Sequence, residues 1–315
     1  MSVQEKIGVV FPGQGSQVSG MGKDFFDRLP ICRQTYEEAS DTLGWDIAAM
    51  CFGDDERLNL TQYTQPCIVT TEVAMMRGLK ELFGFEPHYC GGHSLGEYTA
   101  LVVAGVWPLK DIVVVVHERG RLMQEAVPPG KGGMMAVIGE QLDTSILSDI
   151  LQELPIDVAN VNSLKQIVVS GDMKFMAETE SRLAENFGKG QSLRFVTLNV
   201  SAPFHSRFMS SIEGHFETFL RQFITAIVPE NAIKVTSNYT GGFHAGEGDI
   251  VIHNLVQQLS HAVQWVDNMK ILSSYAKKIY EVGPGRPLRA FFQNLNIECT
   301  SLTTLSAAER LFAQK

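Results

Sequence analysis

The stretch Gly92-His93-Ser94-Leu95-Gly96 decides the fold of the middle of the chain, because it matches G-x-S-x-G between an apolar segment and a helical one. Residues 87–91 are short and apolar enough for a buried strand, and residues 97–104 follow with a helical pattern. A strand, a sharp turn and a helix in this order predict a nucleophile elbow, whose glycines make room where strand and helix meet. Ser94 then lies at a helix N-terminus, where backbone N–H groups favour negative charge.

The composition narrows the class of protein. The chain has 315 residues, 44% of them hydrophobic and 19% charged, which is typical of a globular protein with one or two domains. The net charge of -9 argues against a nucleic-acid partner. No apolar run approaches the roughly 20 residues that span a bilayer, and the first residues lack the apolar region of a secretion signal. Five scattered cysteines without C-x-x-C spacing predict reduced thiols, a cytoplasmic location and no metal site.

Strands alternate with helices on both sides of the elbow. Residues 7–11 form a continuous apolar run that ends in Pro12-Gly13-Gln14-Gly15, which is typical of a buried parallel strand feeding a tight loop. Helical patterns occupy 67–82, where we expect Pro66 to precede the helix, and 108–126. The alternation predicts a doubly wound, α/β-hydrolase-like core with a parallel sheet, built from residues 1–132 and 201–315.

A second unit is expected within this core, after a Gly-rich break at 127–133. The patterns that follow predict a strand at 134–138, a helix at 143–154, strands at 156–161 and 166–170, a helix at 172–187 and a strand at 193–200. This β-α-β-β-α-β order is that of a small ferredoxin-like domain, which we place at 133–200. The alternative is that these elements continue the main sheet. The short turn between Val161 and Gln166 favours the insertion.

Ser94 needs a base to become nucleophilic, and His205 is the best candidate among eight histidines. It follows a Pro-Phe pair in a loop that precedes a helix, whereas the other histidines lie in helical patterns or lack chemical context. His93 adjoins the nucleophile and points elsewhere, since neighbouring elbow residues diverge. A structural role for His205 remains the alternative.

Acyl transfer also requires N–H donors for an oxyanion. The N–H of Leu95, directly after the nucleophile, is the expected first donor, and Gln14 in its glycine loop is a candidate for the second. This loop is not a phosphate-binding loop, because it lacks Gly-Lys-Ser/Thr. It is not a dinucleotide fingerprint either, because Val18 stands where glycine is required.

Arg119 is the clearest indication of a substrate. On the helix predicted at 108–126, it falls on the apolar stripe, three residues after Val116 and four before Met123. A guanidinium turned toward the core needs a carboxylate or several acceptors. Two interpretations stay open: a structural ion pair, or a bidentate grip on the carboxylate of a substrate.

Taken together, these segments resemble the malonyl-CoA:acyl carrier protein transacylase family, which includes freestanding acyltransferases of polyketide systems. Each motif is weakly specific alone, but their joint order and spacing are very specific, and the resemblance covers nearly the whole chain. The matching segments are Phe11-Pro-Gly-Gln-Gly-Ser-Gln17, Thr64-Gln65-Pro66, Gly92-His-Ser-Leu-Gly-Glu-Tyr98, Arg119-Gly120, Asn160-Val-Asn-Ser163, Ser201-Ala-Pro-Phe-His205 and Glu281-Val-Gly-Pro-Gly285.

The resemblance implies a ping-pong transfer of malonyl from malonyl-CoA to the phosphopantetheine thiol of an acyl carrier protein, in fatty-acid or polyketide synthesis. Ser94 would be the nucleophile and His205 its base, with Gln14 and Leu95 as oxyanion donors. Arg119 would bind the malonyl carboxylate, and Gln258 would match the position that orients the histidine.

Further positions follow from the same resemblance. Gln65, Asn160 and Phe204 would contact the substrate, and the ring of Phe204 would leave little room for a 2-methyl branch. The resemblance implies no bound cofactor. Carrier proteins are acidic, so docking on this negative chain needs a local positive patch. The candidates for that patch are Lys189, Arg194, Arg207, Arg286 and Arg289.

Two other functions compete with this interpretation. One is an acyl-thioester hydrolase of the editing type on the same scaffold, which would have no use for a buried arginine if its acyl chains are uncharged. The other is a non-catalytic docking subunit of a larger assembly, which would be expected to have lost Ser94 or His205.

Overall fold

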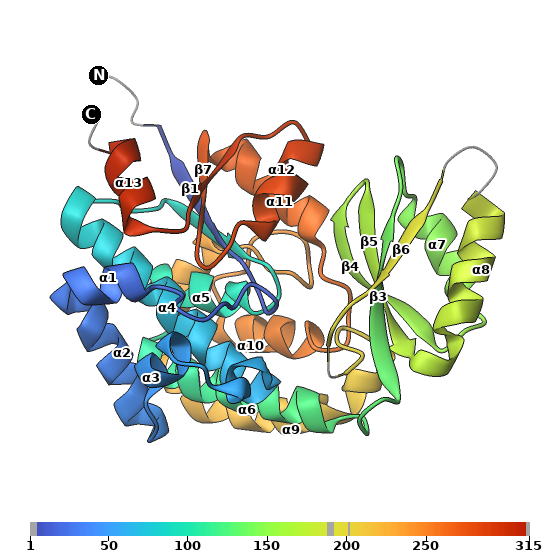
Figure 1. The fold of residues 1–315 in the computed structure, drawn as a ribbon, viewed down its shortest axis with the longest axis horizontal. Coiled ribbons are helices and arrows are strands. Elements are labelled where there is room, and N and C mark those ends of the chain that lie inside the picture. Colours follow the sequence, from blue (N-terminus) through green and yellow to red (C-terminus); the bar gives the residue numbers. More distant parts are fainter. Residues whose placement is uncertain (1–4, 188–191, 201, 313–315) are drawn as a thin grey trace.

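The computed structural model describes residues 5–187, 192–200 and 202–312, so that Lys189 and Ser201 lie outside the described residues. Its strands form two separate four-stranded sheets, one parallel and one antiparallel. In Figure 1 the antiparallel sheet and its helices α7 (Thr144–Leu151) and α8 (Met176–Phe187) occupy one end of the molecule, and the parallel sheet lies within the helices of the other end.

The parallel sheet has the order β2-β1-β7-β8. Its strands are β1 (Ile7–Phe11), β2 (Tyr89–Gly92), β7 (Lys278–Val282) and β8 (Cys299–Leu302). Because all of its pairings are parallel, the carboxyl ends of the strands meet at one edge, where α/β proteins place their ligands. The loops that follow β1 and β2 carry Gln14 and Ser94 to this edge. Strand β8 was not predicted, because Cys299-Thr-Ser-Leu302 is short and half polar.

Helices cover both faces of the parallel sheet, as predicted for a doubly wound core. Alternate residues of β1 point in opposite directions: Val9 and Phe11 join the larger hydrophobic cluster with α4 (Thr61–Phe83) and α5 (Gly96–Val103). Val10 joins a second cluster with α11 (Trp265–Tyr275) and α12 (Pro287–Asn294). The remaining helices are α1 (Lys23–Arg28), α2 (Pro30–Leu43), α3 (Ile47–Phe52), α9 (Ser210–Leu220), α10 (Gly248–Gln257) and α13 (Leu305–Phe312).

Helix α4 (Thr61–Phe83) begins six residues before the predicted start, so Pro66 lies inside the helix and not before it. The prediction was wrong because proline usually opens a helix and the preceding residues are polar. The first turn is instead held by a side chain: the Thr64 hydroxyl donates to the carbonyl oxygens of Leu58 and Leu60, at 2.6 and 3.0 Å. The extra turn matters because it carries Gln65 into the site.

Helix α6 (Leu109–Glu125) matches the helix predicted at 108–126 and packs against the start of α4. Gly120 permits the close approach, since a Cβ atom there would lie 2.6 Å from the carbonyl oxygen of Thr61. Arg119, one residue earlier, is buried as its place on the apolar stripe predicts.

The antiparallel sheet has the order β4-β5-β3-β6, so its strands do not continue the main sheet. The elements follow the predicted sequence: β3 (Gly132–Ile138), α7 (Thr144–Leu151), β4 (Ile156–Ser163), β5 (Gln166–Asp172), α8 (Met176–Phe187) and β6 (Arg194–Thr197). The last strand is shorter than the predicted 193–200. One face of the sheet forms its own hydrophobic cluster, which includes Leu147 and Leu183 of the two helices. Met134, Ala136 and Val168 belong instead to the larger cluster.

No helix in the described part of the chain is long and apolar enough to cross a membrane.

Candidate active site

A cleft of about 570 Å³ opens at the carboxyl edge of the parallel sheet. It is lined by residues near the parallel sheet and by residues of the antiparallel sheet. Seven of the nine predicted site residues line it: Gln14, Gln65, Ser94, Arg119, Asn160, Phe204 and His205. The other two, Leu95 and Gln258, are fully buried beside it. The structure therefore brings together side chains that are up to 244 positions apart, from residue 14 to residue 258.

The nucleophile elbow has the expected geometry. Ser94 has a φ of 51°, a left-handed conformation that costs free energy in a residue with a side chain. A Cβ atom on Gly92 would lie 2.0 Å from the carbonyl carbon of Gly96, so only glycine fits there. Asn238 holds the turn: its Oδ1 accepts from the Ser94 N–H at 2.6 Å, and its Nδ2 donates to the Gly92 carbonyl at 2.8 Å.

Ser94 and His205 are hydrogen-bonded in the geometry that a nucleophile and its base require. The Ser94 Oγ lies 2.7 Å from His205 Nε2, and His205 Nδ1 lies 2.7 Å from the backbone carbonyl oxygen of Gln258. Since a carbonyl only accepts, Nδ1 carries the proton and Nε2 is free to accept the one on Ser94. Burial, and secondly the charge of Arg119, lower the pKa of His205 to about 3, which keeps the imidazole neutral at neutral pH.

The loop after β1 lies directly against the elbow. A Cβ atom on Gly13 would be 2.5 Å from the carbonyl oxygen of His93 and 3.7 Å from the backbone nitrogen of Leu95. The Gln14 side chain anchors the loop by donating to the Thr61 hydroxyl at 3.1 Å. The loop that carries Gln14 is thus packed against the segment that carries Ser94 and Leu95, and Gln14 and Ser94 both line the cleft.

Arg119 is 1% exposed, and its hydrogen-bond partners are neutral. Its Nη1 donates to Gln65 Oε1 at 3.0 Å, and its Nη2 donates to Gln258 Oε1 at 2.9 Å and to the Ser94 hydroxyl at 3.2 Å. The guanidinium also lies over the ring of Tyr98, 5.2 Å from the ring centre. None of these contacts, within the described residues, is with a carboxylate, so the structure contains no direct structural ion pair for Arg119.

The antiparallel sheet contributes the opposite wall. Asn160, on β4, is 5% exposed and faces the cleft, and the neighbouring Val161 N–H donates to the carbonyl oxygen of Val263 at 2.9 Å. His93 of the elbow contacts Asn162 of β4, with 2.7 Å between His93 Nε2 and Asn162 Oδ1. Burial lowers the pKa of His93 to about 4. His93 therefore joins the two walls of the cleft and does not face the Ser94 hydroxyl.

Sequence reasoning missed Asn238, Asn268 and the group formed by Glu97, His244 and Asn254. Asn238 follows the segment Ala232-Ile-Lys-Val-Thr-Ser237, whose Val235 pairs in parallel with Cys90 of β2. A polar residue after a strand-like run, at the edge that carries Ser94, was the available signal. Glu97 was visible within the elbow motif, but its partners are at least 141 positions away.

The candidate docking residues have different environments. Arg207 binds the Asp157 carboxylate through its backbone N–H, Nε and Nη2, which neutralises its charge. Arg194, Arg286 and Arg289 are exposed, and Lys189 lies outside the described residues.

An activated serine, a neutral histidine and a buried arginine at the edge of a parallel sheet define a serine-dependent acyltransferase or a close relative of one. A family model described as an acyl transferase domain matches residues 9–284 and places the chain among the acyltransferases.

Comparison with individual proteins identifies the family more narrowly than the domain model does. The chain is 36% identical over 298 residues to a malonyl CoA-acyl carrier protein transacylase of Bacillus subtilis (strain 168), covering 92% of this chain and 90% of that protein. The Staphylococcus aureus (strain COL) protein of the same name is 36% identical over 314 residues, covering 95% and 96%. The chain belongs to the malonyl CoA-acyl carrier protein transacylase family.

Solved structures of malonyl transacylases superpose closely on this chain. The transacylase of Clostridium perfringens superposes with a TM-score of 0.89 at 33% identity, covering 98% of this chain and 96% of that one. A type II polyketide-synthase malonyl-transacylase in complex with its acyl carrier protein superposes with a TM-score of 0.85 at 30% identity, covering 98% and 100%.

Proposed function

We propose that this chain moves a malonyl group from malonyl-CoA to the phosphopantetheine thiol of an acyl carrier protein, through an ester on Ser94. The observation that carries the proposal is Arg119: a buried cation within 3.2 Å of the nucleophile, with amides and a hydroxyl as partners. A malonyl thioester carries a carboxylate two bonds from the reacting carbonyl carbon. This carboxylate supplies the negatively charged partner that the guanidinium of Arg119 does not have in the structure.

In the first half-reaction, the Ser94 oxygen attacks the thioester carbonyl carbon while His205 Nε2 takes the hydroxyl proton. The resulting oxyanion is stabilised by the N–H groups of Leu95 and Gln14, a contribution of about 10²–10³ in rate for each such donor. The C–S bond then breaks, and the departing sulfur of coenzyme A receives the proton from His205. A malonyl ester remains on Ser94, with its carboxylate on Arg119.

Binding of the carboxylate also affects the base. The Arg119 charge is one of the causes that lower the pKa of His205, after burial. A substrate carboxylate on Arg119 offsets that charge and raises the pKa of His205 toward the range in which an imidazole is an efficient base. A substrate with the correct charge thereby strengthens the group that activates Ser94.

In the second half-reaction, His205 takes the proton from the carrier thiol, the sulfur attacks the ester carbonyl, and the proton returns to Ser94 as its C–O bond breaks. The related polyketide transacylase that was solved with its carrier protein supports such a partner. Fatty-acid and polyketide synthesis both use this transfer, and a cytoplasmic setting suits the five buried free cysteines.

The environment of Arg119 argues against the editing hydrolase, since an uncharged acyl chain would leave the guanidinium without a countercharge. The intact Ser94–His205 pair argues against a docking subunit without catalysis.

We further propose that residues 133–200 are a ferredoxin-like domain inserted into an α/β-hydrolase-like core of residues 1–132 and 201–315. The strand order β4-β5-β3-β6 with antiparallel pairing supports this, as does the separate hydrophobic cluster under α7 and α8. The catalytic cleft would then lie between the two domains.

The proposal is tested by intact-protein mass spectrometry after brief incubation with malonyl-CoA. We expect a malonyl adduct on the wild-type chain, none on Ser94→Ala, and loss of the adduct when holo carrier protein is added. Release of free coenzyme A without an adduct or a malonylated carrier would contradict the transfer and favour hydrolysis.

A further inference from the structure

Glu97 is a buried carboxylate three residues after the nucleophile, and it has no part in the mechanism above. It is the second residue of α5 and is 0% exposed. A buried carboxylate is costly unless donors surround it, so its partners indicate what it is for.

Three donors converge on this carboxylate from two distant parts of the chain, residues 238–244 and Gln258. Its Oε2 accepts from the Asn238 backbone N–H at 3.0 Å and from Gln258 Nε2 at 2.6 Å. Its Oε1 lies 2.7 Å from His244 Nε2. The other ring nitrogen of His244, Nδ1, lies 3.2 Å from the amide Nδ2 of Asn254, which can only donate. His244 is therefore neutral with its proton on Nε2, and Glu97 carries the negative charge.

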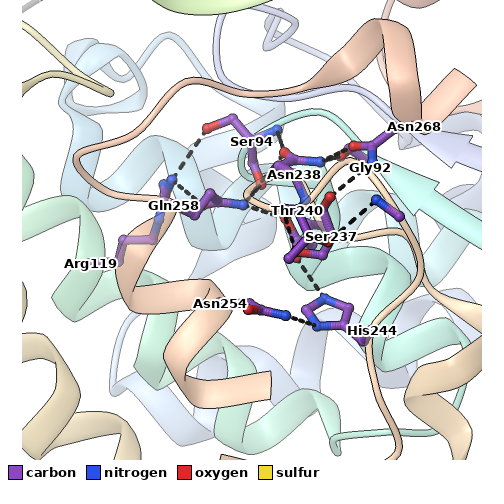
Figure 2. A network of polar contacts seen from close by, with 12 residues as sticks. Gly92, Ser94, Arg119, Ser237, Asn238, Thr240, His244, Asn254, Gln258 and Asn268 are labelled. Carbon is purple, nitrogen blue, oxygen red and sulfur yellow. Dashed lines mark hydrogen bonds and ion pairs between the residues drawn. The ribbon is translucent and has the colours of Figure 1, made fainter. Parts of the chain in front are cut away.

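The amide of Gln258 connects this carboxylate to the active site. Figure 2 shows Gln258 between Arg119 and the segment that carries Ser94, with His244 and Asn254 on the far side of the network. The Gln258 Nε2 faces two acceptors, Glu97 Oε2 and the Ser94 carbonyl oxygen, the latter at 3.0 Å. Its Oε1 consequently faces Arg119 Nη2 at 2.9 Å. One amide thus separates a buried cation from a buried anion and is polarised by both.

We propose that Glu97, held by His244, is a positioning residue that acts through Gln258 as the remote countercharge of Arg119 and so sets the preference for acyl groups that bear a carboxylate. The inference rests on the proposed function. With the charge on Glu97, the amide of Gln258 presents an oxygen to Arg119 and fixes the guanidinium beside Ser94. The remaining charge of Arg119 is left for the substrate.

Removal of the charge releases this constraint. In Glu97→Gln, the new amide can present either its oxygen or its nitrogen to Gln258, and the Gln258 amide can turn its nitrogen toward Arg119. The guanidinium then loses an acceptor and its fixed direction. Malonyl-CoA depends on that direction, whereas acetyl-CoA has no carboxylate and does not.

The experiment measures kcat and KM for acylation of Ser94 by malonyl-CoA and by acetyl-CoA, by intact mass, in wild type and in Glu97→Gln. The matched control is Glu72→Gln, another fully buried glutamate, whose carboxylate accepts from the Thr99 hydroxyl at 2.5 Å. Burial raises the pKa of Glu72 well above its ordinary value, and its hydrogen bond to Thr99 joins α4 to α5.

We expect Glu97→Gln to lower kcat/KM for malonyl-CoA about tenfold or more, mainly through KM, because hydrogen bonds to charged groups are lost. We expect acetyl-CoA to change less than about threefold in Glu97→Gln, and both substrates to change that little in Glu72→Gln. Adding Glu97→Gln to Arg119→Ala should have little further effect, since the two residues act on one interaction.

If Glu97→Gln lowers kcat/KM equally for malonyl-CoA and acetyl-CoA, or changes neither, the proposal about Glu97 is overturned. The proposed function would still stand in that case, provided that malonyl-CoA acylates the wild-type chain. A wild-type chain that malonyl-CoA does not acylate would overturn both. If Glu97→Gln does not fold, His244→Leu replaces it, because it removes the donor to Oε1. The malonyl-over-acetyl preference must then fall in the same direction, and an unchanged preference would refute the role of Glu97.

Discussion

At the scale of single residues, the cleft places the proposed nucleophile Ser94 within hydrogen-bond distance of a neutral histidine and of a guanidinium that contacts no carboxylate among the described residues. Ser94 Oγ is 2.7 Å from His205 Nε2 and 3.2 Å from Arg119 Nη2. A backbone carbonyl, that of Gln258, orients the histidine, so the site needs no acidic third residue beside His205. The acidic residue of the network, Glu97, instead faces the amide of Gln258.

In the proposed mechanism, Phe204 is the residue expected to limit the space beside the acyl group. Its ring is 7% exposed and lines the cleft next to His205. We predict that methylmalonyl-CoA is a poor substrate and that Phe204→Ala raises its use relative to malonyl-CoA by about tenfold or more, as expected when a pocket gains room for one methyl group. A competition assay with both thioesters measures the ratio.

The control for this prediction is Phe208→Ala, since Phe208 packs against the main hydrophobic cluster and is not among the lining residues of the cleft. Phe208→Ala should keep the preference for malonyl-CoA. Equal use of the two thioesters by the wild-type chain would contradict the assignment to Phe204.

The nine site residues could be proposed from the sequence because short motifs carry them, and their order along the chain matched one family. Asn238 and His244 were not proposed, because their roles depend on partners more than 140 positions away. The protonation of His205 and the neutral partners of Arg119 are likewise properties of the folded site. The choice between an ion pair and a substrate carboxylate could only be made once those partners were known.

At the scale of elements, the site depends on how closely α6 approaches α4. Gly120 brings the two helices together, so that Arg119 of α6 reaches Gln65 of α4 at 3.0 Å. Periodicity predicted α6 well. It missed the first turn of α4, where hydrogen bonds from Thr64 replace the usual signals of a helix start. Short polar β8 was missed for a similar reason, since its pairing with β7 and not its composition makes it a strand.

We predict that Gly120→Ala destabilises the protein by about 1–3 kcal/mol, because the added methyl group collides with backbone atoms that cannot move independently. The displacement of Arg119 should also slow acylation by malonyl-CoA. Urea denaturation gives the free energy of unfolding.

The matched control is Gly214→Ala in α9, where an added Cβ meets nothing within 4 Å. That change should stabilise the protein by up to about 1 kcal/mol, the usual advantage of alanine in a helix. If Gly120→Ala were as stable as Gly214→Ala, the close packing of α6 on α4 would not be needed.

At the scale of the whole molecule, two units share one cleft. The separate antiparallel sheet supplies Asn160, and its Asn162 is joined to His93 of the elbow across the cleft. The order of the elements that build the antiparallel sheet was predictable from the sequence, whereas β8 of the parallel sheet was not. The contacts between the sheets were not, because they join β4 to residues more than 50 positions away, such as Val263 and His93.

Burial of a neutral histidine in this cleft links the stability of the whole fold to pH. The pKa of His205 is about 3 in the folded chain, against about 6.5 for an unperturbed histidine. The unfolded chain therefore binds a proton below pH 6.5 that the folded chain does not. The contribution of neutral His205 to the free energy of unfolding is complete above about pH 6.5 and is lost as the pH falls from there toward 3.

We predict that wild type loses stability between pH 7.5 and 5, and that about 2 kcal/mol of this loss is absent in His205→Gln, which has no titrating ring. Urea denaturation of both chains at the two pH values isolates the histidine from other titrating groups. An identical loss in wild type and variant would show that His205 is already protonated in the fold or titrates normally.

The central claim is that Arg119 is kept without a carboxylate partner so that the substrate supplies one. The most direct measurement is the rate of Ser94 acylation by malonyl-CoA and by acetyl-CoA in wild type and in Arg119→Ala. Wild type should strongly prefer malonyl-CoA. Arg119→Ala should lose about 100-fold or more with malonyl-CoA, the scale of a lost buried charge-assisted pair, while acetyl-CoA is used as well as before or better. A proportional loss with both thioesters would contradict the claim and make Arg119 a structural residue.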